Sequence, residues 1–363
     1  MNRLRHILPF ALFAVAIVAA QLCMRVTETE YYLTQLTMSL YYAIVVMGLC
    51  LLMGHAGQVS LGHGAFFAIG GYTSAVLTTH DFTRISSAVW PGWLEPAHLF
   101  VAKQDLYGGQ TMTVSPWAAF LVAMVATFLV ACLIGYPALR LRGHYLAMAT
   151  LGFGLIVNKL VLASAIAGAA DGINGVPEWT LGFGLVVSGK STARVQNYYI
   201  ACGLVLLLLL LLRNLVRSRV GRALAAIHDR EIAANAMGID TAAYKLKTFV
   251  LSAMLAATAG VFFTHYTGGI GPSEAGALKS VRYVALAAAG GMGSLWGVTG
   301  ISTALNYFSL RGWFGSYDNA VFGVILILII SLAPAGPLQP LGHWLRRLLS
   351  RLFQGGRRPH GAA

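Results

Sequence analysis

Charged residues are scarce in this chain of 363 residues, because Asp, Glu, Lys and Arg together make up only 10% of it. A typical soluble domain carries about 25% charged residues. The shortage excludes an ordinary cytosolic enzyme, and it also excludes a disordered chain, which requires high polarity. Apolar residues fill the place of the charges, since 57% of the chain is hydrophobic and its mean hydropathy is +0.71. The composition predicts an all-α polytopic membrane protein.

Cysteine is also rare, and Cys23, Cys50, Cys132 and Cys202 all lie in apolar runs. Neither a C-x-x-C pair nor a His at zinc spacing accompanies them, so we expect buried free thiols rather than a disulfide or a metal site. The sequence also lacks H-E-x-x-H and any Ser, His and Asp set at useful spacing. We therefore predict no catalytic residue, no metal and no cofactor.

Long apolar runs recur along the chain. A helix needs about 20 mostly apolar residues to cross the hydrocarbon core of a bilayer. By that measure we predict about ten spans, within a range of about eight to ten. The range reflects the runs 281–296 and 298–311, which are short and Gly-rich. The runs are 8–24, 31–53, 59–79, 115–136, 145–168, 197–213, 247–268, 281–296, 298–311 and 319–335.

The first run has two interpretations. Arg3 and Arg5 precede an apolar stretch that ends at Ala20, which is the pattern of a secretory signal peptide or of an uncleaved signal anchor. Val18-Ala19-Ala20 is a weak cleavage site and many spans follow, so the sequence favours the anchor.

The net charge of +13 is concentrated on one side of the predicted topology. With the N-terminus inside, the inner segments are 1–7, 137–144, 213–247 and 336–363, and they hold 16 of the 25 Lys and Arg against three acids. This bias follows the positive-inside rule and predicts that both termini are cytoplasmic. Nucleic acid is not an expected partner, because no basic stretch is interleaved with aromatic residues.

Residues 184–191 match the phosphate-binding pattern G-x-x-x-x-G-K-[ST] literally. A working site also needs a buried strand before the loop, a solvated helix after it and an acidic partner for magnesium. Here an apolar span follows from Asn197, and the loop falls on the outer side. We therefore interpret the match as a polar Gly/Ser loop.

The stretch 54–75 combines many glycines with polar residues inside an apolar region. Broken helices at membrane depth occur only where the backbone lines a cavity or is buried in protein. One interpretation is a discontinuous helix beside a substrate pathway, with Gln58, Ser60, Gly62 and Gly64 as candidate pathway residues. The other is tight packing of small residues, and the sequence does not decide between them.

The stretch 213–247 lacks the hydrophobicity of a span and is broken by Gly238. An apolar stripe in it fits short amphipathic helices, which would form a docking surface for a soluble partner or an interfacial helix. An ordinary basic loop is the alternative. The stripe consists of Ala223, Leu224, Ile227, Ile232, Ala236 and Met237.

Four stretches in order resemble the LivM-type permease of bacterial branched-chain amino acid ABC importers, and the likeness extends over nearly the whole chain. The third stretch resembles the loop through which importer permeases contact their ATPase. The stretches are GQVSLGHGAFFAIGGY (57–72), LRLRGHYLAMATLGFG (139–154), GRALAAIHDREIAANAMGID (221–240) and AAAGGMGSLWGVTG (287–300).

This resemblance implies an ABC importer permease fold, with a permease domain over 1–345 and a basic cytoplasmic tail over 346–363. It further implies a bacterial inner-membrane location, a homologous sister permease, two cytoplasmic ABC ATPases and a periplasmic amino-acid-binding protein. In the coupling loop 213–247, the family pattern falls on Glu231, Ala233, Ala234 and Gly238. Arg222 and Glu231 are the candidate polar contacts to the ATPase.

Two other functions remain open. A stand-alone secondary transporter or channel usually places carboxylates in the membrane, and the predicted spans contain no Asp or Glu. An ABC permease for urea or short amides would share the same fold. Lys159 is a charge within a predicted span, so it is either a pathway residue, a partner contact or a side chain that snorkels to the interface.

Overall fold

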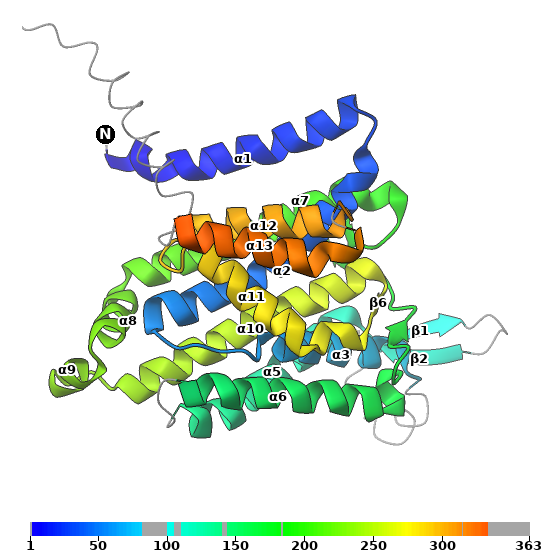
Figure 1. Cartoon of the computed structure of the whole chain (residues 1–363). Helices are drawn as coiled ribbons and strands as arrows, with labels where there is room; N and C mark the ends of the chain where they lie inside the picture. Colours follow the sequence, from blue (N-terminus) through cyan, green and yellow to red (C-terminus); the bar gives the residue numbers. More distant parts are fainter. Residues whose placement is uncertain are drawn as a thin grey trace, which may run out of the picture.

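The helices of the chain lie side by side in a bundle, with small strand pairs beside it (Figure 1). A computed structural model describes residues 2–81, 100–104, 110–139, 144–182, 184–313 and 315–332, so the predicted tail 346–363 lies outside the described residues. The α-helices are α1 (Asn2–Val26), α2 (Leu33–Leu49), α3 (His63–Thr79), α5 (Pro116–Ala138), α6 (His144–Ala163), α7 (Arg194–Arg217), α8 (Arg219–Asp229), α9 (Glu231–Ala236), α10 (Thr241–Thr267), α11 (Ala277–Ala289), α12 (Leu295–Leu310) and α13 (Asp318–Leu332).

Helices occupy each of the ten apolar runs, although not all of them are long. Five helical stretches in the described residues are long and apolar enough to cross a membrane. They are Tyr32–His55, Pro116–Ala138, Tyr145–Ala163, Ser191–Arg217 and Thr241–Thr267. Helices α3, α11, α12 and α13 have 17, 13, 16 and 15 residues, which is below the usual length of a span. The polytopic helical class is confirmed, and the number of spans stays a prediction.

Short strands and 3₁₀ turns connect the helices at one end of the bundle. The strands pair in antiparallel fashion as β1 with β2, β3 with β6, and β4 with β5. Their bounds are β1 (Phe100–Gln104), β2 (Gln110–Val114), β3 (Ile173–Asn174), β4 (Trp179–Gly182), β5 (Leu185–Val187) and β6 (Gly269–Ile270). The phosphate-loop match therefore lies on a hairpin strand and the turn after it, where Lys190 forms an ion pair with Glu178.

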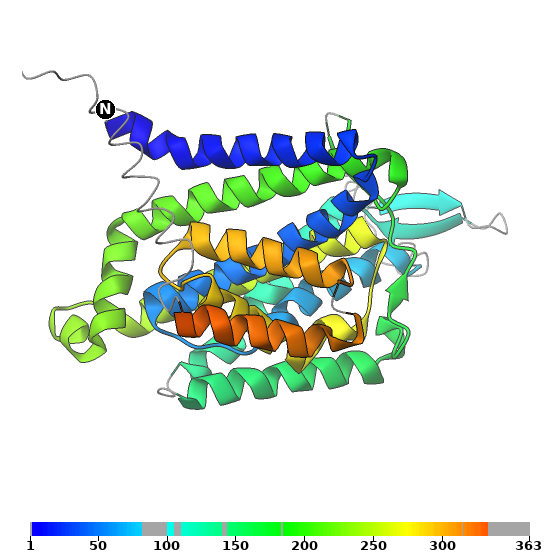
Figure 2. The ribbon, with the colours of Figure 1, turned by 45° about the horizontal axis from the view of Figure 1, so that its top comes forward.

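Helices α8 and α9 lie at the opposite end of the bundle from the β1–β2 hairpin (Figures 1 and 2). The start of α1 and the end of α13 lie toward the α8–α9 end in the same views. Helix α1 is peripheral and packs along α7, where the Tyr198 hydroxyl donates to the Ile17 carbonyl at 3.1 Å. The core is formed by the neighbouring helices α2, α3 and α10.

Small residues allow the central helices to approach closely. A Cβ placed on Gly70 of α3 would lie 2.5 Å from the Ala257 carbonyl oxygen of α10. A Cβ on Gly260 of α10 would lie 2.0 Å from the Phe67 carbonyl oxygen of α3. Neither contact leaves room for a side chain, so glycine sets this helix spacing, as is common between membrane helices.

The chain reverses direction twice in the centre of the bundle. Helix α2 runs toward α8 and α3 runs away from it, while α10 runs away from α8 and α11 runs back toward it (Figure 1). Helix α3 packs on α10, α5 and α6, and α11 packs on α2, α12 and α13. The stretch before each returning helix has a buried polar residue, Ser60 before α3 and Glu274 before α11.

Candidate translocation site and coupling loop

Residues 57–62 form a non-helical stretch between α2 and α3, which we call the interrupted segment. A π-helical turn, η2 (Cys50–His55), ends α2, and regular helix resumes only at His63. Gly57 has φ +67°, a left-handed conformation that costs other residues about 1–2 kcal/mol, and its neighbour Gln58 donates its backbone N–H to the Leu52 carbonyl at 3.1 Å. The glycine therefore turns the chain back toward the interior of the bundle.

Side-chain hydrogen bonds anchor this segment in the middle of the bundle. The His63 Nε2 atom is 2.7 Å from Ser252 Oγ, near the centre of the 27-residue α10, and its Nδ1 atom is 3.1 Å from Ser60 Oγ. The Leu61 N–H donates to Thr150 Oγ1 of α6 at 2.9 Å. The polar residues of the segment thus link it to α10 and α6, as structural hydrogen-bonding groups.

The structure brings four of the predicted pathway residues together. Gln58 and Ser60 are buried, and neither the Nε2 nor the Oε1 atom of Gln58 has a hydrogen-bond partner among the described residues. A Cβ on Gly62 would lie 2.7 Å from the Thr150 carbonyl oxygen, and one on Gly64 would lie 2.7 Å from Ser280 Oγ. Both glycines therefore allow close packing, and the buried Gln58 amide is the unusual group.

Lys159 lies apart from these residues. It is exposed on the outer face of α6, beside the exposed side chains of Ile156 and Leu160. Its ammonium group has no partner within the described part of the chain. The neighbouring Asn158 instead faces inward and donates to the Pro272 carbonyl at 2.9 Å.

The structure contains a buried charge cluster that the sequence did not reveal. Glu274, in the 3₁₀ turn η6 (Pro272–Ala275), is only 7% exposed, and Lys279 of α11 donates to its two carboxylate oxygens at 2.9 and 3.0 Å. The Tyr42 hydroxyl of α2 donates to Glu274 Oε1 at 3.1 Å and accepts from Lys279 at 2.9 Å. Both residues lie between the predicted runs 247–268 and 281–296, and the sequence alone does not show that Glu274 is buried in the bundle.

A second charge pair lies next to this cluster on α11. Arg282 Nη1 donates to Asp318 Oδ2 at 3.4 Å, and the Ser309 hydroxyl donates to the same oxygen at 2.8 Å. Arg282 lies within the run 281–296, so this predicted span contains a charge, as the span with Lys159 does. That charge inside an apolar run was the signal by which the sequence could have indicated this site.

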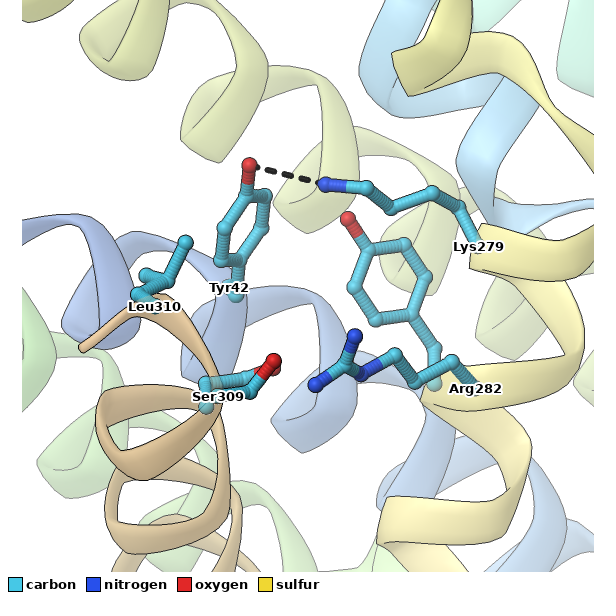
Figure 3. A pocket seen from close by; sticks show the side chains of 7 residues that line it. Tyr42, Lys279, Arg282, Ser309 and Leu310 are labelled. Carbon is cyan, nitrogen blue, oxygen red and sulfur yellow. Dashed lines mark hydrogen bonds between the residues drawn. The ribbon is translucent and has the colours of Figure 1, made fainter. Parts of the chain in front are cut away.

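A small cavity of about 30 Å³ opens between α2, α11 and α12 beside these charges (Figure 3). Lys279 and Arg282 lie on one side of it, with Ser309 and Leu310 opposite. The full lining is Tyr42, Lys279, Arg282, Tyr283, Asn306, Ser309 and Leu310. The cavity wall therefore contains two cations and several hydroxyl and amide groups.

The predicted coupling loop 213–247 is largely helical. It contains the last residues of α7, the two short helices α8 and α9, and the first residues of α10. Arg222 and Ala233 are exposed, Glu231 pairs with Lys245, and Ala234 is buried at 4% exposure. Gly238 has φ +83° and ends α9, where its N–H donates to the Asn235 carbonyl at 3.0 Å. Helix α8 is amphipathic, as the sequence predicts, because Leu224 and Ile227 face inward.

The apolar stripe divides between the interior and the surface. Ile232 is 81% exposed and Met237 is 83% exposed, so these two residues do not pack on this chain. They lie on and just after α9 at the far end of the bundle (Figure 2). These two apolar side chains are therefore available for contact with another protein.

Helix α8 touches the interrupted segment directly. A Cβ on Gly57 would lie 2.8 Å from His228 Nδ1 of α8, which places the two residues in van der Waals contact. The Cys50 thiol donates to the Met292 carbonyl at 3.0 Å, and Gly54 also packs on that carbonyl. The coupling loop, the end of α2 and the α11–α12 turn therefore meet at one point.

Comparison with known proteins identifies the family. The family model for the permease component of branched-chain amino acid transport systems matches residues 31–330. The high-affinity branched-chain amino acid transport system permease protein LivM of Salmonella typhimurium is 33% identical over 325 residues, which cover 83% of this chain and 68% of that protein. LivM of Escherichia coli is 32% identical over 326 residues, covering 83% of this chain and 68% of that protein.

The chain is also similar to permeases of the LivH type. The permease protein LivH of Escherichia coli is 26% identical over 329 residues, which cover 85% of this chain and 96% of LivH. No solved structure matches the chain. The match over residues 31–330 shows that this chain belongs to the family of permease components of branched-chain amino acid transport systems.

Proposed function

We propose that the chain is the membrane-spanning permease subunit of an ATP-driven ABC importer for branched-chain amino acids. It forms half of the translocation pathway, and partner subunits hydrolyse ATP. The observation that carries this proposal is the contact between α8 and the interrupted segment, at Gly57 and His228. That contact links a surface suited to an ATPase with the polar segment suited to a pathway.

The exposed side of the interrupted segment indicates where the pathway runs. Val59 is 42% exposed, and the N–H groups of Val59 and Ser60 have no partner among the described residues. Non-helical backbone cannot face lipid, because its polar groups would lack hydrogen bonds there. The face of this segment is therefore covered by a sister permease or lines a watery pathway. The candidate pathway residues Gln58, Ser60, Gly62 and Gly64 belong to the same part of the chain and are buried in this conformation, and Lys159 lies on the neighbouring α6.

Helices α8 and α9 form the docking surface for a cytoplasmic ATPase. Arg222, Ala233 and the exposed pair Ile232 and Met237 supply the contacts, while Ala234 and Gly238 shape the helix and its end. Glu231 is held by Lys245. When the ATPases close, α8 moves and displaces Gly57, which shifts the interrupted segment.

The assembly contains the parts that the family implies. Relatives of both the LivM and the LivH kind suggest that this chain pairs with a sister permease. Two ATPases dock on the cytoplasmic side, and a periplasmic binding protein delivers the amino acid to the other side. About ten spans, one of them broken in the stretch 54–75, place both termini in the cytoplasm of a bacterial inner-membrane protein.

A stand-alone secondary transporter is the alternative, and the buried Glu274 is the observation that favours it. Ion-coupled carriers use buried carboxylates to bind a proton or cation. Lys279 already contacts both oxygens of this carboxylate, with the Tyr42 hydroxyl on one of them. The pair is thus neutralised, which leaves no free carboxylate for a coupling ion at this position.

Purification and uptake assays test the proposal. We expect two ATPases and a sister permease to co-purify with the tagged chain, and proteoliposomes with the leucine-loaded binding protein to accumulate leucine only with ATP. Uptake by the chain alone, without ATP, would show that it is a stand-alone carrier. Uptake of urea or a short amide instead of leucine would keep the permease role and change the substrate.

A further inference from the structure

The cavity beside α11 contains polar atoms without partners. Within the described residues, Arg282 Nε and Nη2, Asn306 Nδ2 and the Tyr283 hydroxyl make no hydrogen bond, and neither does Asp318 Oδ1, which belongs to the carboxylate beside Arg282. Tyr283 is 1% exposed and Asn306 is 5% exposed, so solvent outside the bundle cannot satisfy them. The site is therefore incomplete as the chain alone forms it.

The unpartnered nitrogen atoms that line the cavity, on Arg282 and Asn306, need a hydrogen-bond acceptor. The guanidinium and amide nitrogens only donate hydrogen bonds. Arg282 uses Nη1 for Asp318 and stacks on the Phe322 ring at 4.2 Å, which leaves the Nε and Nη2 edge as a free fork. Two parallel N–H groups of this kind match the two oxygens of a carboxylate.

The neighbouring charges strengthen this preference. Glu274 neutralises Lys279 through two short contacts, whereas Asp318 holds Arg282 through a single contact of 3.4 Å and also accepts from Ser309. The guanidinium is therefore the less fully paired cation of the two. Figure 3 shows it directed across the cavity toward Ser309.

The position of the cavity suits the first step of import. Ser309 and Leu310 lie at the C-terminal end of α12. The N-terminal end of α12 follows the turn at Met292, which contacts η2 near α8. The cavity thus lies away from the coupling loop. Further polar groups lie deeper in the bundle. They are Glu274, the Gly64 N–H, which donates to Ser280 Oγ at 3.1 Å, and the His63–Ser252 pair.

We propose that this cavity is a carboxylate-binding subsite, in which Arg282 and Asn306 receive the carboxylate of the transported amino acid. The proposal rests on the proposed import function. A volume of about 30 Å³ admits about two waters by the usual measure, so it fits a carboxylate group and leaves the side chain of the amino acid outside. Because the fork is covered in this conformation, the carboxylate binds after the surrounding side chains part during the transport cycle.

The test compares two matched arginine substitutions in the complete transporter. Arg282→Lys keeps the charge and loses the fork, and we expect the KM for leucine uptake to rise about tenfold, the equivalent of about 1.4 kcal/mol. Arg311→Lys is the control, because Arg311 follows α12 and stacks on Tyr32 and Trp313 without lining the cavity. We expect its KM to equal that of the wild type. An unchanged KM for Arg282→Lys would overturn the subsite.

A second measurement uses the wild-type complex and avoids any folding defect. A structure of the complete transporter with saturating L-leucine should show a carboxylate against Arg282 Nε and Nη2. Water alone in the cavity, in a complex that holds leucine elsewhere, would overturn the proposal. A complex that transports no leucine would instead show that the import function itself is wrong, so the two failures are distinguishable.

Discussion

Gly57 connects the coupling loop to the interrupted segment through a backbone conformation that other residues adopt at a cost. Its φ of +67° and the 2.8 Å approach of His228 Nδ1 leave no room for a methyl group. We expect Gly57→Ala to reduce ATP-dependent uptake several-fold while the ATPases still bind, because the α8 contact is displaced. Uptake and ATP hydrolysis by the reconstituted complex measure this. Gly203→Ala, on α7 with open space at its Cβ, is the control and should transport normally.

Glu274 and Lys279 form a buried pair whose partners depend on each other. Glu274→Gln leaves the Lys279 charge uncompensated in the bundle, which typically costs about 3–5 kcal/mol when a buried pair is broken. We therefore expect a lower midpoint of thermal unfolding in detergent, and recovery of much of it in the double variant with Lys279→Met. Glu178→Gln breaks the exposed pair with Lys190 and should change the midpoint little. A Glu274→Gln variant as stable as the wild type would contradict this account.

At the scale of elements, hydropathy located the helices and the gaps between them, but not how the gaps fold. The runs predicted from the sequence each contain a helix, and the amphipathic pattern of 213–247 correctly indicated α8 and α9. The burial of Glu274 could not be predicted, because an acid between two apolar runs has the same pattern whether the segment is exposed or buried in the bundle. Lys159 looked like a buried charge in the sequence because it lies in an apolar run. The run does not show that one face of α6 points outward, and Lys159 lies on that face.

The short helix α9 and the residue after it present apolar side chains that this chain does not cover. Ile232 and Met237 are both more than four-fifths exposed, at 81% and 83%. We expect Ile232→Asp and Met237→Asp each to abolish co-purification of the ATPases, because a carboxylate would be buried in the interface. Pull-down of the ATPase with the tagged permease measures this. Ile166→Asp, exposed in the 3₁₀ turn beyond α6, is the control, and equal loss in the control would indicate a folding defect instead.

At the scale of the molecule, the stretches before α3 and α11 meet inside the bundle. Helices α3 and α11 both start inside the bundle and contact each other, with Gly64 against Ser280. The segment before α3 is partly exposed at Val59, beside α6 and α11, whereas the exposed residues of α5 form an ordinary helical surface. Lipid can cover a helical surface, but it cannot cover non-helical backbone.

Thiol accessibility distinguishes these two faces. In a complex in which Cys23, Cys50, Cys132 and Cys202 are replaced by Ser, we expect Val59→Cys to react with a charged methanethiosulfonate reagent. Its rate should change when ATP and vanadate trap the ATPases, because α8 moves the segment through Gly57. Leu129→Cys, on α5 and 60% exposed, should stay unreactive, since lipid excludes the charged reagent. If Val59→Cys were as unreactive as Leu129→Cys in every state, the pathway would not run along the interrupted segment.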